Sequence, residues 1–142
     1  METSVFKPFE RHAVVDLWRR CNLIVAWNNP NRDIDRKVAH SPENFWVGYV
    51  DGVLIASVMF GYDGHRGSVN YLAIDPAYQG RGYGRQLMEA VEGQMQSWGC
   101  PKINLAVRST NRQVLAFYEA LGYKTDPVSS LGKRFEDDDP VF

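Results

Sequence analysis

The stretch Gln79-Gly80-Arg81-Gly82-Tyr83-Gly84 joins a strand-like run, residues 68–75, to a helix-like run that begins at Gly84. Such a loop presents several backbone N–H groups at a helix N-terminus, where the helix dipole favours a bound negative charge. Its three glycines let the backbone approach a ligand without an intervening Cβ, and Arg81 and Arg85 add positive charge. The stretch therefore predicts a phosphate-binding loop.

Strand-like and helical patterns alternate on both sides of this loop. Before it, they predict a strand near Val5, a helix through Val14 and Cys21, a short helix within residues 27–42, and antiparallel strands over residues 45–50, 53–62 and 68–75. After it, they predict a helix from Gly84 to Trp98, a strand through Ile103, Leu105 and Val107, a helix from about Asn111 to Leu121, and a strand around residues 129–135. The order indicates an α/β (α+β mixed) fold, with one mixed sheet and helices on its faces.

The composition favours a single domain over residues 1–142. With 44% hydrophobic and 23% charged residues, the chain is long enough to bury a hydrophobic core. Its net charge of −1 gives no general attraction to nucleic acid or to a membrane. The longest nearly apolar run, residues 53–60, is far shorter than the roughly 20 residues that span a bilayer. We expect a cytoplasmic protein with a solvated acidic tail, residues 136–142.

Two familiar phosphate loops and a metal site do not fit the sequence. The dinucleotide pattern GxGxxG would need its third glycine at Arg85, and no Gly-Lys-Ser or Gly-Lys-Thr triplet of the Walker type occurs. Cys21 and Cys100 are isolated thiols without CxxC spacing, and the three histidines form no HExxH pair. We therefore expect no metal and no disulfide framework.

The loop matches a pattern of the GNAT family of N-acetyltransferases, Gln/Arg-x-x-Gly-x-Gly/Ala, in Gln79, Gly82 and Gly84. Residues 72–76 resemble that family's fourth strand, and Asn111 with residues 116–123 is similar to its last helix. The resemblance covers nearly the whole chain, and it is specifically to the small bacterial YpeA-like branch. It implies a twisted, mostly antiparallel mixed sheet of six to seven strands, flanked by about four helices and splayed between the fourth and fifth strands.

The resemblance also implies an acetyl-CoA-dependent N-acetyltransferase. The pyrophosphate of acetyl-CoA, the cosubstrate, would sit on the loop amides, and its pantetheine arm would pair with the edge of the fourth strand. An acceptor amine would attack the thioester directly, and Tyr118 would protonate the leaving thiolate as general acid. Packing alone could also explain Tyr118, and helix capping could explain Asn111. The implied cofactor-binding residues are Leu72, Ala73, Ile74, Gln79, Gly80, Arg81, Gly82, Tyr83, Gly84, Arg85 and Asn111.

The acceptor side departs from the family's pattern. Many members carry Glu or His on the fourth strand, whereas the corresponding Ser68 and Asn70 cannot take a proton at neutral pH. A water relay, Asp63 or His65 could replace that base, although the run that contains the last two also suits a plain polar turn.

The acceptor itself is predicted from the chemistry of amines. A lysine side chain is roughly 0.1% neutral near pH 7.4, whereas an α-amine is about one-third neutral. A small amine or a peptide N-terminus therefore fits better than a lysine side chain. Trp27 and Asn28 lie in the loop that often lines this family's acceptor pocket. A non-catalytic acyl-CoA-binding sensor, a longer acyl donor and a homodimer remain open alternatives.

Overall fold

Five strands form one sheet in the computed structural model, which describes residues 1–138. In spatial order they are β1 (Glu2–Val5), β2 (Phe45–Val50), β3 (Val53–Tyr62), β4 (Gly67–Ile74) and β5 (Ile103–Asn104). β1 to β4 pair antiparallel, and β5 pairs parallel with β4. The mixed, mostly antiparallel sheet is confirmed, but the prediction of six to seven strands is wrong.

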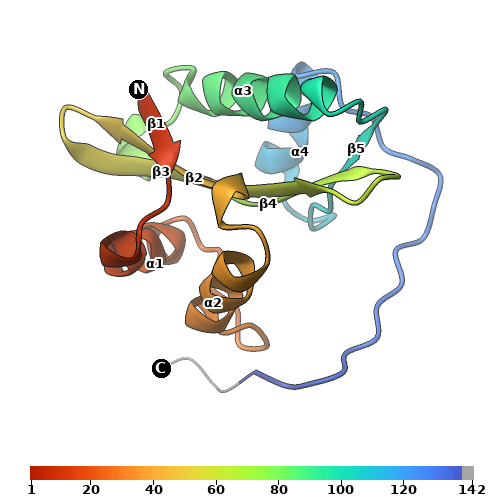
Figure 1. The fold of residues 1–142 in the computed structure, drawn as a ribbon. Coiled ribbons are helices and arrows are strands. Elements are labelled where there is room, and N and C mark those ends of the chain that lie inside the picture. Colours follow the sequence, from red (N-terminus) through yellow and green to blue (C-terminus); the bar gives the residue numbers. More distant parts are fainter. Residues whose placement is uncertain (139–142) are drawn as a thin grey trace.

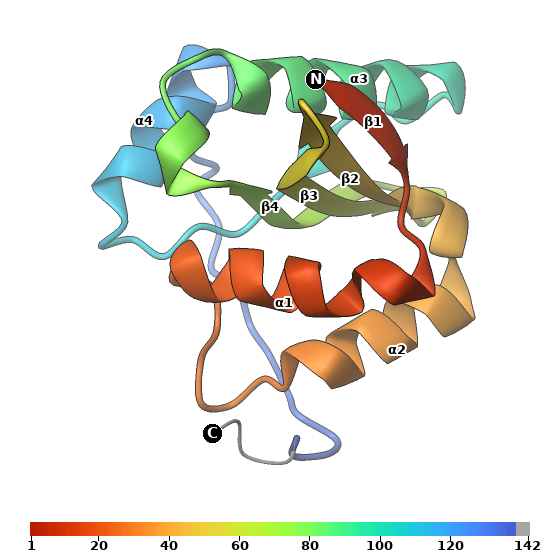
Figure 2. The ribbon, with the colours of Figure 1, turned by 90° about the vertical axis from the view of Figure 1, so that its left-hand side faces the viewer.

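Two pairs of helices cover the two faces of this sheet (Figures 1 and 2). α1 (Arg11–Arg20) and α2 (Pro30–His40) lie on one face, and α3 (Tyr83–Ser97) and α4 (Arg112–Ala120) lie on the other. Each pair buries its own apolar cluster against the sheet, with Trp18 in the first cluster and Val91 in the second. The short 3-10 helices are η1 (Pro8–Glu10), η2 (Pro42–Asn44) and η3 (Pro76–Tyr78). The expected four helices are confirmed.

Local sequence signals explain where several elements begin and end. Asp51 and Gly52 adopt φ angles of +49° and +76°, which suits the two-residue turn between β2 and β3. The Asn29 side chain caps α2 by accepting a hydrogen bond from the N–H of Asn31 at 3.0 Å, and Pro30 occupies the first helical position. The predicted hairpin and the short second helix are therefore confirmed.

β4 carries one extra residue in its middle. Met59 pairs with Asn70 and Ser57 pairs with Ala73, so a single residue of β3 faces two residues of β4. Tyr71, within this bulge, has a φ angle of +52°. The bulge shifts the alternation of side chains, because Val69 before it and Leu72 and Ile74 after it all pack in the cluster beneath α3.

β5 pairs with β4 over a short distance only. Ile103 and Asn104 pair with Gly67 and Ser68, and the described chain places no strand beside residues 69–74 on that side. The predicted strand through residues 103–107 is therefore only two residues long. Its side-chain alternation nevertheless holds, since Ile103, Leu105 and Val107 are half-buried and the residues between them are exposed.

The C-terminal segment differs from its prediction. Residues 129–135 form no strand and pair with none of the five strands of the sheet, and Leu131 is 93% exposed. The acidic run is not simply solvated: Arg36 of α2 forms ion pairs with Glu136 at 2.9 Å and with Asp138 at 2.5 Å. The guanidinium offers several donors in one plane and can hold two carboxylates. Residues 139–142 of the predicted tail lie outside the described residues.

None of the helices within residues 1–138 has both the length and the apolar character needed to cross a membrane.

Candidate active site

The glycine-rich loop is held in shape by polar contacts at its start. The Asp75 side chain accepts a hydrogen bond from the N–H of Ala77 at 2.9 Å and forms an ion pair with Arg20 of α1. The Gln79 amide donates from Nε2 to the carbonyl of Ile74 at 3.0 Å. The predicted ligand residue Gln79 therefore closes the turn that joins β4 to the loop.

Gly80 and Gly82 give the loop its path. Their φ angles are +77° and +86°, a region that side chains with a Cβ rarely adopt. The N–H groups of residues 80–85 donate to no other described residue, and the first intrahelical bond runs from Gln86 to the carbonyl of Gly82 at 3.0 Å. The loop thus gathers free amide donors at the positive end of α3, where a negative charge is stabilised.

The two arginines of the loop point in different directions. The Arg81 guanidinium lies over the Tyr78 ring at 5.2 Å, on the exposed side of the loop. Arg85 instead donates to the carbonyl of Ala120 at 3.3 Å and lies 3.7 Å from Glu89. Arg81 is free to reach a ligand on the loop, whereas Arg85 is engaged with the C-terminal end of α4.

Gly84 serves the packing of α3 against α4. A Cβ at this position would lie 2.9 Å from Cε1 of Phe117, closer than real Cβ contacts come. The absence of a side chain therefore brings α4 close to the start of α3 and places Tyr118, the next residue of α4, near the loop. Tyr83, the first residue of α3, is half-buried in the same cluster.

The edge of β4 beyond the bulge faces an open side of the sheet. The N–H of Asp75 donates to the carbonyl of Ile55 in β3 at 2.7 Å, so Ile74, one residue earlier, directs its N–H and C=O away from β3. The same alternation turns Leu72 outward, while Ala73 faces β3 opposite Ser57. The backbone groups of Leu72 and the N–H of Ile74 can therefore pair with an extended ligand, whereas the Ile74 carbonyl already accepts hydrogen bonds from Gln79 at 3.0 Å and from the Cys21 thiol at 3.3 Å.

Tyr118 lies in the apolar cluster that includes Leu72 and Ile74. Its side chain is 8% exposed and contacts the rings of Phe117 and Tyr123 at centroid distances of 5.1 and 5.4 Å. Its hydroxyl forms no hydrogen bond within residues 1–138. Burial raises the pKa of Tyr118 to about 12. The hydroxyl therefore stays protonated at neutral pH and is available as a donor.

Asn111 precedes α4 and is its N-cap. Its side chain accepts a hydrogen bond from the N–H of Val114 at 3.3 Å. Of the two interpretations offered by the sequence, helix capping is thus confirmed, and a contact with pantetheine stays a prediction.

The bulge residue Tyr71 was missed in the sequence analysis. Its ring stacks on Trp18 at a centroid distance of 3.8 Å, and its hydroxyl donates to Asp33 of α2 at 2.5 Å. Its carbonyl accepts a hydrogen bond from Ser57, which in turn accepts one from the Trp18 indole. Burial, together with the bond to Asp33, raises the pKa of Tyr71 above its ordinary value. No pattern in the sequence around Tyr71 predicts a bulge at this residue.

The predicted acceptor residues do not gather in one place. Ser68 and Asn70 are exposed and lie on the face opposite to Val69, which packs beneath α3. Asp63 and His65 lie in the turn before β4, at the opposite end of that strand from the glycine-rich loop (Figure 1).

The structure confirms the turn interpretation of this run. Asp63 accepts hydrogen bonds from the N–H groups of Arg66 and His65, and these bonds hold its pKa below the usual value. A carboxylate with a lowered pKa is a weaker base, so Asp63 is the poorer of the two base candidates.

Trp27 and Asn28 lie in the connection between α1 and α2. Trp27 is 58% exposed, and the Arg108 guanidinium lies 5.5 Å from its ring. The Asn28 side chain accepts a hydrogen bond from Arg134 at 3.3 Å. This connection therefore meets the segment before α4 on one side and the C-terminal segment on the other, a contact that no local pattern signals.

The described residues contain no group of three or more His, Cys, Asp or Glu side chains that could hold a metal ion.

Comparisons with known proteins agree with this arrangement. The sequence profile of the Acetyltransferase (GNAT) family matches residues 11–123. An acetyltransferase of Yersinia pestis (strain Pestoides F) is 45% identical over 134 residues, covering 94% of this chain and 95% of that protein. The ribosomal-protein-S18-alanine N-acetyltransferase of Escherichia coli shares the fold with a TM-score of 0.71 at 21% identity, over 85% of this chain and 76% of that one. Ard1 from Thermoplasma volcanium does so with a TM-score of 0.75 at 20% identity, over 85% and 80%. The chain therefore belongs to the GNAT family and is an enzyme of the N-acetyltransferase type.

Proposed function

We propose that residues 1–142 work as one domain that moves the acetyl group of acetyl-CoA to a primary amine. The observation that carries this proposal is the meeting of two sets of free backbone groups at one end of β4. The amides of residues 80–85 suit the negative pyrophosphate, and the open edge at Leu72 and Ile74 suits the peptide-like pantetheine arm. Arg81 would add charge beside the pyrophosphate.

The acetyl group would then lie in the opening between β4 and β5. The acceptor nitrogen attacks the thioester carbonyl carbon, so a C–N bond forms and the carbonyl oxygen takes up negative charge. An outward N–H of the β4 edge, at Leu72 or Ile74, would stabilise this oxygen. When the C–S bond breaks, Tyr118 gives its proton to the leaving sulfur and regains one from water. The remaining ammonium proton of the product leaves to solvent.

The proposed acceptor is a small amine or a peptide N-terminus. Ser68 and Asn70 offer no base on β4, and the lowered pKa of Asp63 weakens that alternative. An acceptor amine that is about one-third neutral at pH 7.4 depends less on a general base than a lysine side chain, which is roughly 0.1% neutral. A water molecule, with or without His65, would then suffice to carry the proton away. The cytoplasmic location stays a prediction.

The test is a panel of acceptors supplied with acetyl-CoA, read by the release of free thiol. A peptide with a free N-terminus and blocked lysines, its counterpart with a blocked N-terminus and a free lysine, and a polyamine form the panel. We expect the first peptide or a small amine to react fastest. Reaction of the lysine peptide alone would overturn the acceptor class. Tight binding of acetyl-CoA without thiol release from any acceptor would favour the sensor alternative.

A further inference from the structure

The connection between α1 and α2, residues 21–29, bridges the two sides of the opening between β4 and β5. At its start, the Cys21 thiol donates to the carbonyl of Ile74, at the end of β4, at 3.3 Å. Near its end, the Trp27 ring contacts Arg108, four residues beyond β5. The connection lies on the opposite side of the sheet from α3 and α4 (Figure 2). It therefore borders the opening on the face away from the glycine-rich loop.

Two arginines from distant parts of the chain meet this connection at adjacent positions. The Arg108 guanidinium lies 5.5 Å from the centre of the Trp27 ring. The guanidinium of Arg134, in the C-terminal arm (residues 124–138), donates to the Asn28 side chain at 3.3 Å. A guanidinium has five N–H donors, so these contacts leave most of them available. Trp27 is 58% exposed, and both arginines are exposed as well.

Neither arginine has a carboxylate partner in the part of the chain that the structure describes. The four acidic side chains of the arm do not supply one, since Lys102 pairs with Asp126, Arg36 pairs with Glu136 and Asp138, and Asp137 forms no ion pair within residues 1–138. Two parallel N–H donors of a guanidinium match the two oxygens of a carboxylate. The two arginines are therefore suited to a carboxylate that a ligand brings.

An open hollow of about 720 Å³ beside Arg134 leaves room for such a ligand. It lies between the arm and Arg36 of α2. Lys133 also lines it and forms no ion pair with any described residue. The carboxylate among its lining residues, Glu136, is paired with Arg36 at 2.9 Å. The unpaired charge at this hollow is positive, which favours a negative group.

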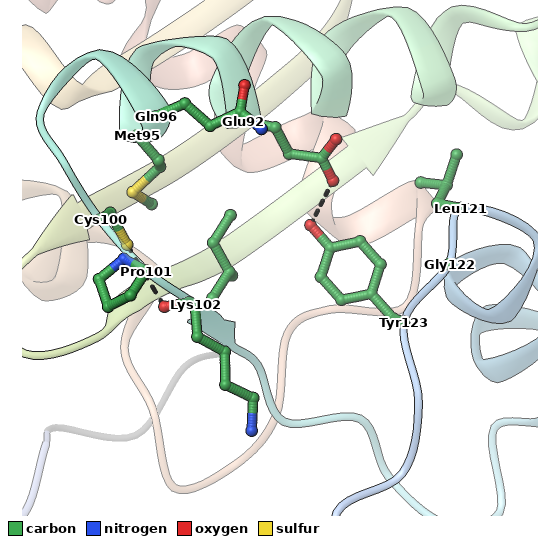
Figure 3. A pocket seen from close by; sticks show the side chains of 10 residues that line it. Glu92, Met95, Gln96, Cys100, Pro101, Lys102, Leu121, Gly122 and Tyr123 are labelled. Carbon is green, nitrogen blue, oxygen red and sulfur yellow. Dashed lines mark hydrogen bonds between the residues drawn. The ribbon is translucent and has the colours of Figure 1, made fainter.

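Another hollow, of about 240 Å³, lacks such an unpaired charge (Figure 3). Its walls belong to α3, β5 and the turn after α4. Its basic residue, Lys102, forms an ion pair with Asp126 at 2.7 Å. Its carboxylate, Glu92, accepts a hydrogen bond from the Tyr123 hydroxyl at 2.5 Å. Both charged groups are thus already bonded within the chain.

We propose that the acceptor amine carries a carboxylate, and that Arg108 and Arg134 bind this group at the connection between α1 and α2. The inference rests on the proposed function, because it assumes an acceptor that enters the opening between β4 and β5 from this face. Trp27, between the opening and the arginines, contacts the apolar part of the acceptor. The carboxylate has two chemical sources: the C-terminus of a short acceptor, or an acidic side chain near the N-terminus of a peptide.

Two matched pairs of acceptors, supplied with acetyl-CoA and read by thiol release, test the inference. A dipeptide with a free C-terminus and its amide test the terminal carboxylate. Two tripeptide amides, with glutamate or glutamine at the second position, test an acidic side chain. We expect kcat/KM to be about tenfold higher for the acidic member of at least one pair, the effect of a hydrogen bond to a charged group.

The outcomes separate this inference from the proposed function. Equal kcat/KM within both pairs would overturn the inference and leave the acetyl transfer itself intact. No thiol release from any of the four acceptors would overturn both.

Substitution of the arginines locates the carboxylate. Arg108→Gln and Arg134→Gln should each lower the ratio of kcat/KM between the acidic and the neutral acceptor at least about threefold, while the KM for acetyl-CoA stays within a factor of about two. A general loss of structure would lower both values of kcat/KM together, so the ratio reports the charge contact. Arg66→Gln, in the turn before β4 and without an ion pair within residues 1–138, is the matched control and should keep the ratio. A natural ratio in either of the other two variants would overturn the two-arginine site.

Discussion

The proposed donor side and the proposed acceptor side of this enzyme are built in different ways. The donor side consists of one continuous segment, from Ile74 to Arg85, in which Gln79 and Asp75 bond to their neighbours in sequence. The proposed acceptor side includes the connection between α1 and α2, where Asn28 accepts a hydrogen bond from Arg134 of the C-terminal arm, residues 124–138, which lies far away in the chain. A continuous segment that requires particular backbone angles can be predicted from its sequence. A surface formed by segments far apart in the chain cannot.

The largest expected effect concerns Tyr118, the proposed general acid. Tyr118→Phe should lower turnover about 100-fold or more, the range of general acid catalysis, because the leaving thiolate then lacks a proton donor. The affinity for acetyl-CoA, measured by calorimetry, should stay within a factor of two to three, since the ring and its packing are kept. Pre-steady-state thiol release measures the chemical step.

Tyr123→Phe is the matched control for that variant. Its ring contacts Tyr118 at 5.4 Å, but its hydroxyl is bonded to Glu92 instead of facing the proposed site. Turnover should change little. Equal losses in both variants would mean that packing, not proton donation, explains Tyr118.

The dependence of the rate on pH separates the roles of the two sides. Below the pKa of the acceptor amine, kcat/KM should rise about tenfold per pH unit as the amine loses its proton. Tyr118 loses its acid form only as the pH rises through about 12, so it should cause no decline below pH 10. A peptide α-amine should therefore reach a plateau by about pH 9, whereas the rate with a lysine side chain should still be rising at about pH 10.

The measurement needs a check on folding, because alkaline pH also acts on other groups. Circular dichroism at each pH should show an unchanged fold up to pH 10. A decline in kcat/KM between pH 8 and 10 with the fold intact would point to an essential acid other than Tyr118.

Much of the donor side could be predicted from the sequence for physical reasons. Gly80 and Gly82 have φ angles that exclude most other residues, and the loop amides follow directly from their place before a helix. Gly84 has a further role that the sequence did not predict, because a Cβ there would lie 2.9 Å from the ring of Phe117; its contact with the cofactor stays a prediction. A glycine in a sequence can indicate that another group packs closely against the backbone, but it does not show which group this is.

The surroundings of the proposed acceptor residues could not be predicted from the sequence, because they depend on contacts between distant parts of the chain. Tyr71 in the bulge stacks on Trp18 and donates a hydrogen bond to Asp33, and neither contact leaves a pattern near residue 71. Arg36 engages the acidic run across about 100 positions of sequence, so a charge run that suits solvent instead pairs with α2. The predicted strand count was wrong for a similar reason: residues 129–135 have a strand-like sequence, but in the structure they pair with no other strand.

A smaller effect is expected from adding one methyl group on the donor side. Gly84→Ala should lower the free energy of unfolding by about 1–2 kcal/mol, because its Cβ would lie 2.9 Å from the half-buried ring of Phe117. Gly93→Ala, on the same helix with no atom within 4 Å of its Cβ, should instead stabilise the protein by up to about 1 kcal/mol. Urea unfolding measures both.

A second substitution shows whether the contact itself is responsible. Phe117→Ala should remove most of the difference between Gly84→Ala and its parent. If Gly84→Ala is as harmful without the ring as with it, close packing of α3 on α4 is not the reason for this glycine.

The smallest effect is expected at the ion pairs that hold the C-terminal arm, residues 124–138, on α2. Arg36→Gln removes the charge that binds Glu136 and Asp138, and exposed ion pairs contribute little to stability. The unfolding midpoint should hardly move, while trypsin should cut faster after Lys133 and Arg134 and the KM for the acceptor should rise a few-fold. Arg11→Gln breaks a comparable pair with Asp35, away from the arm, and should change neither the rate of trypsin cleavage nor the KM for the acceptor. A rise in the KM for acetyl-CoA in the Arg36 variant would show that the arm also supports the donor side, and the two sides would then be coupled.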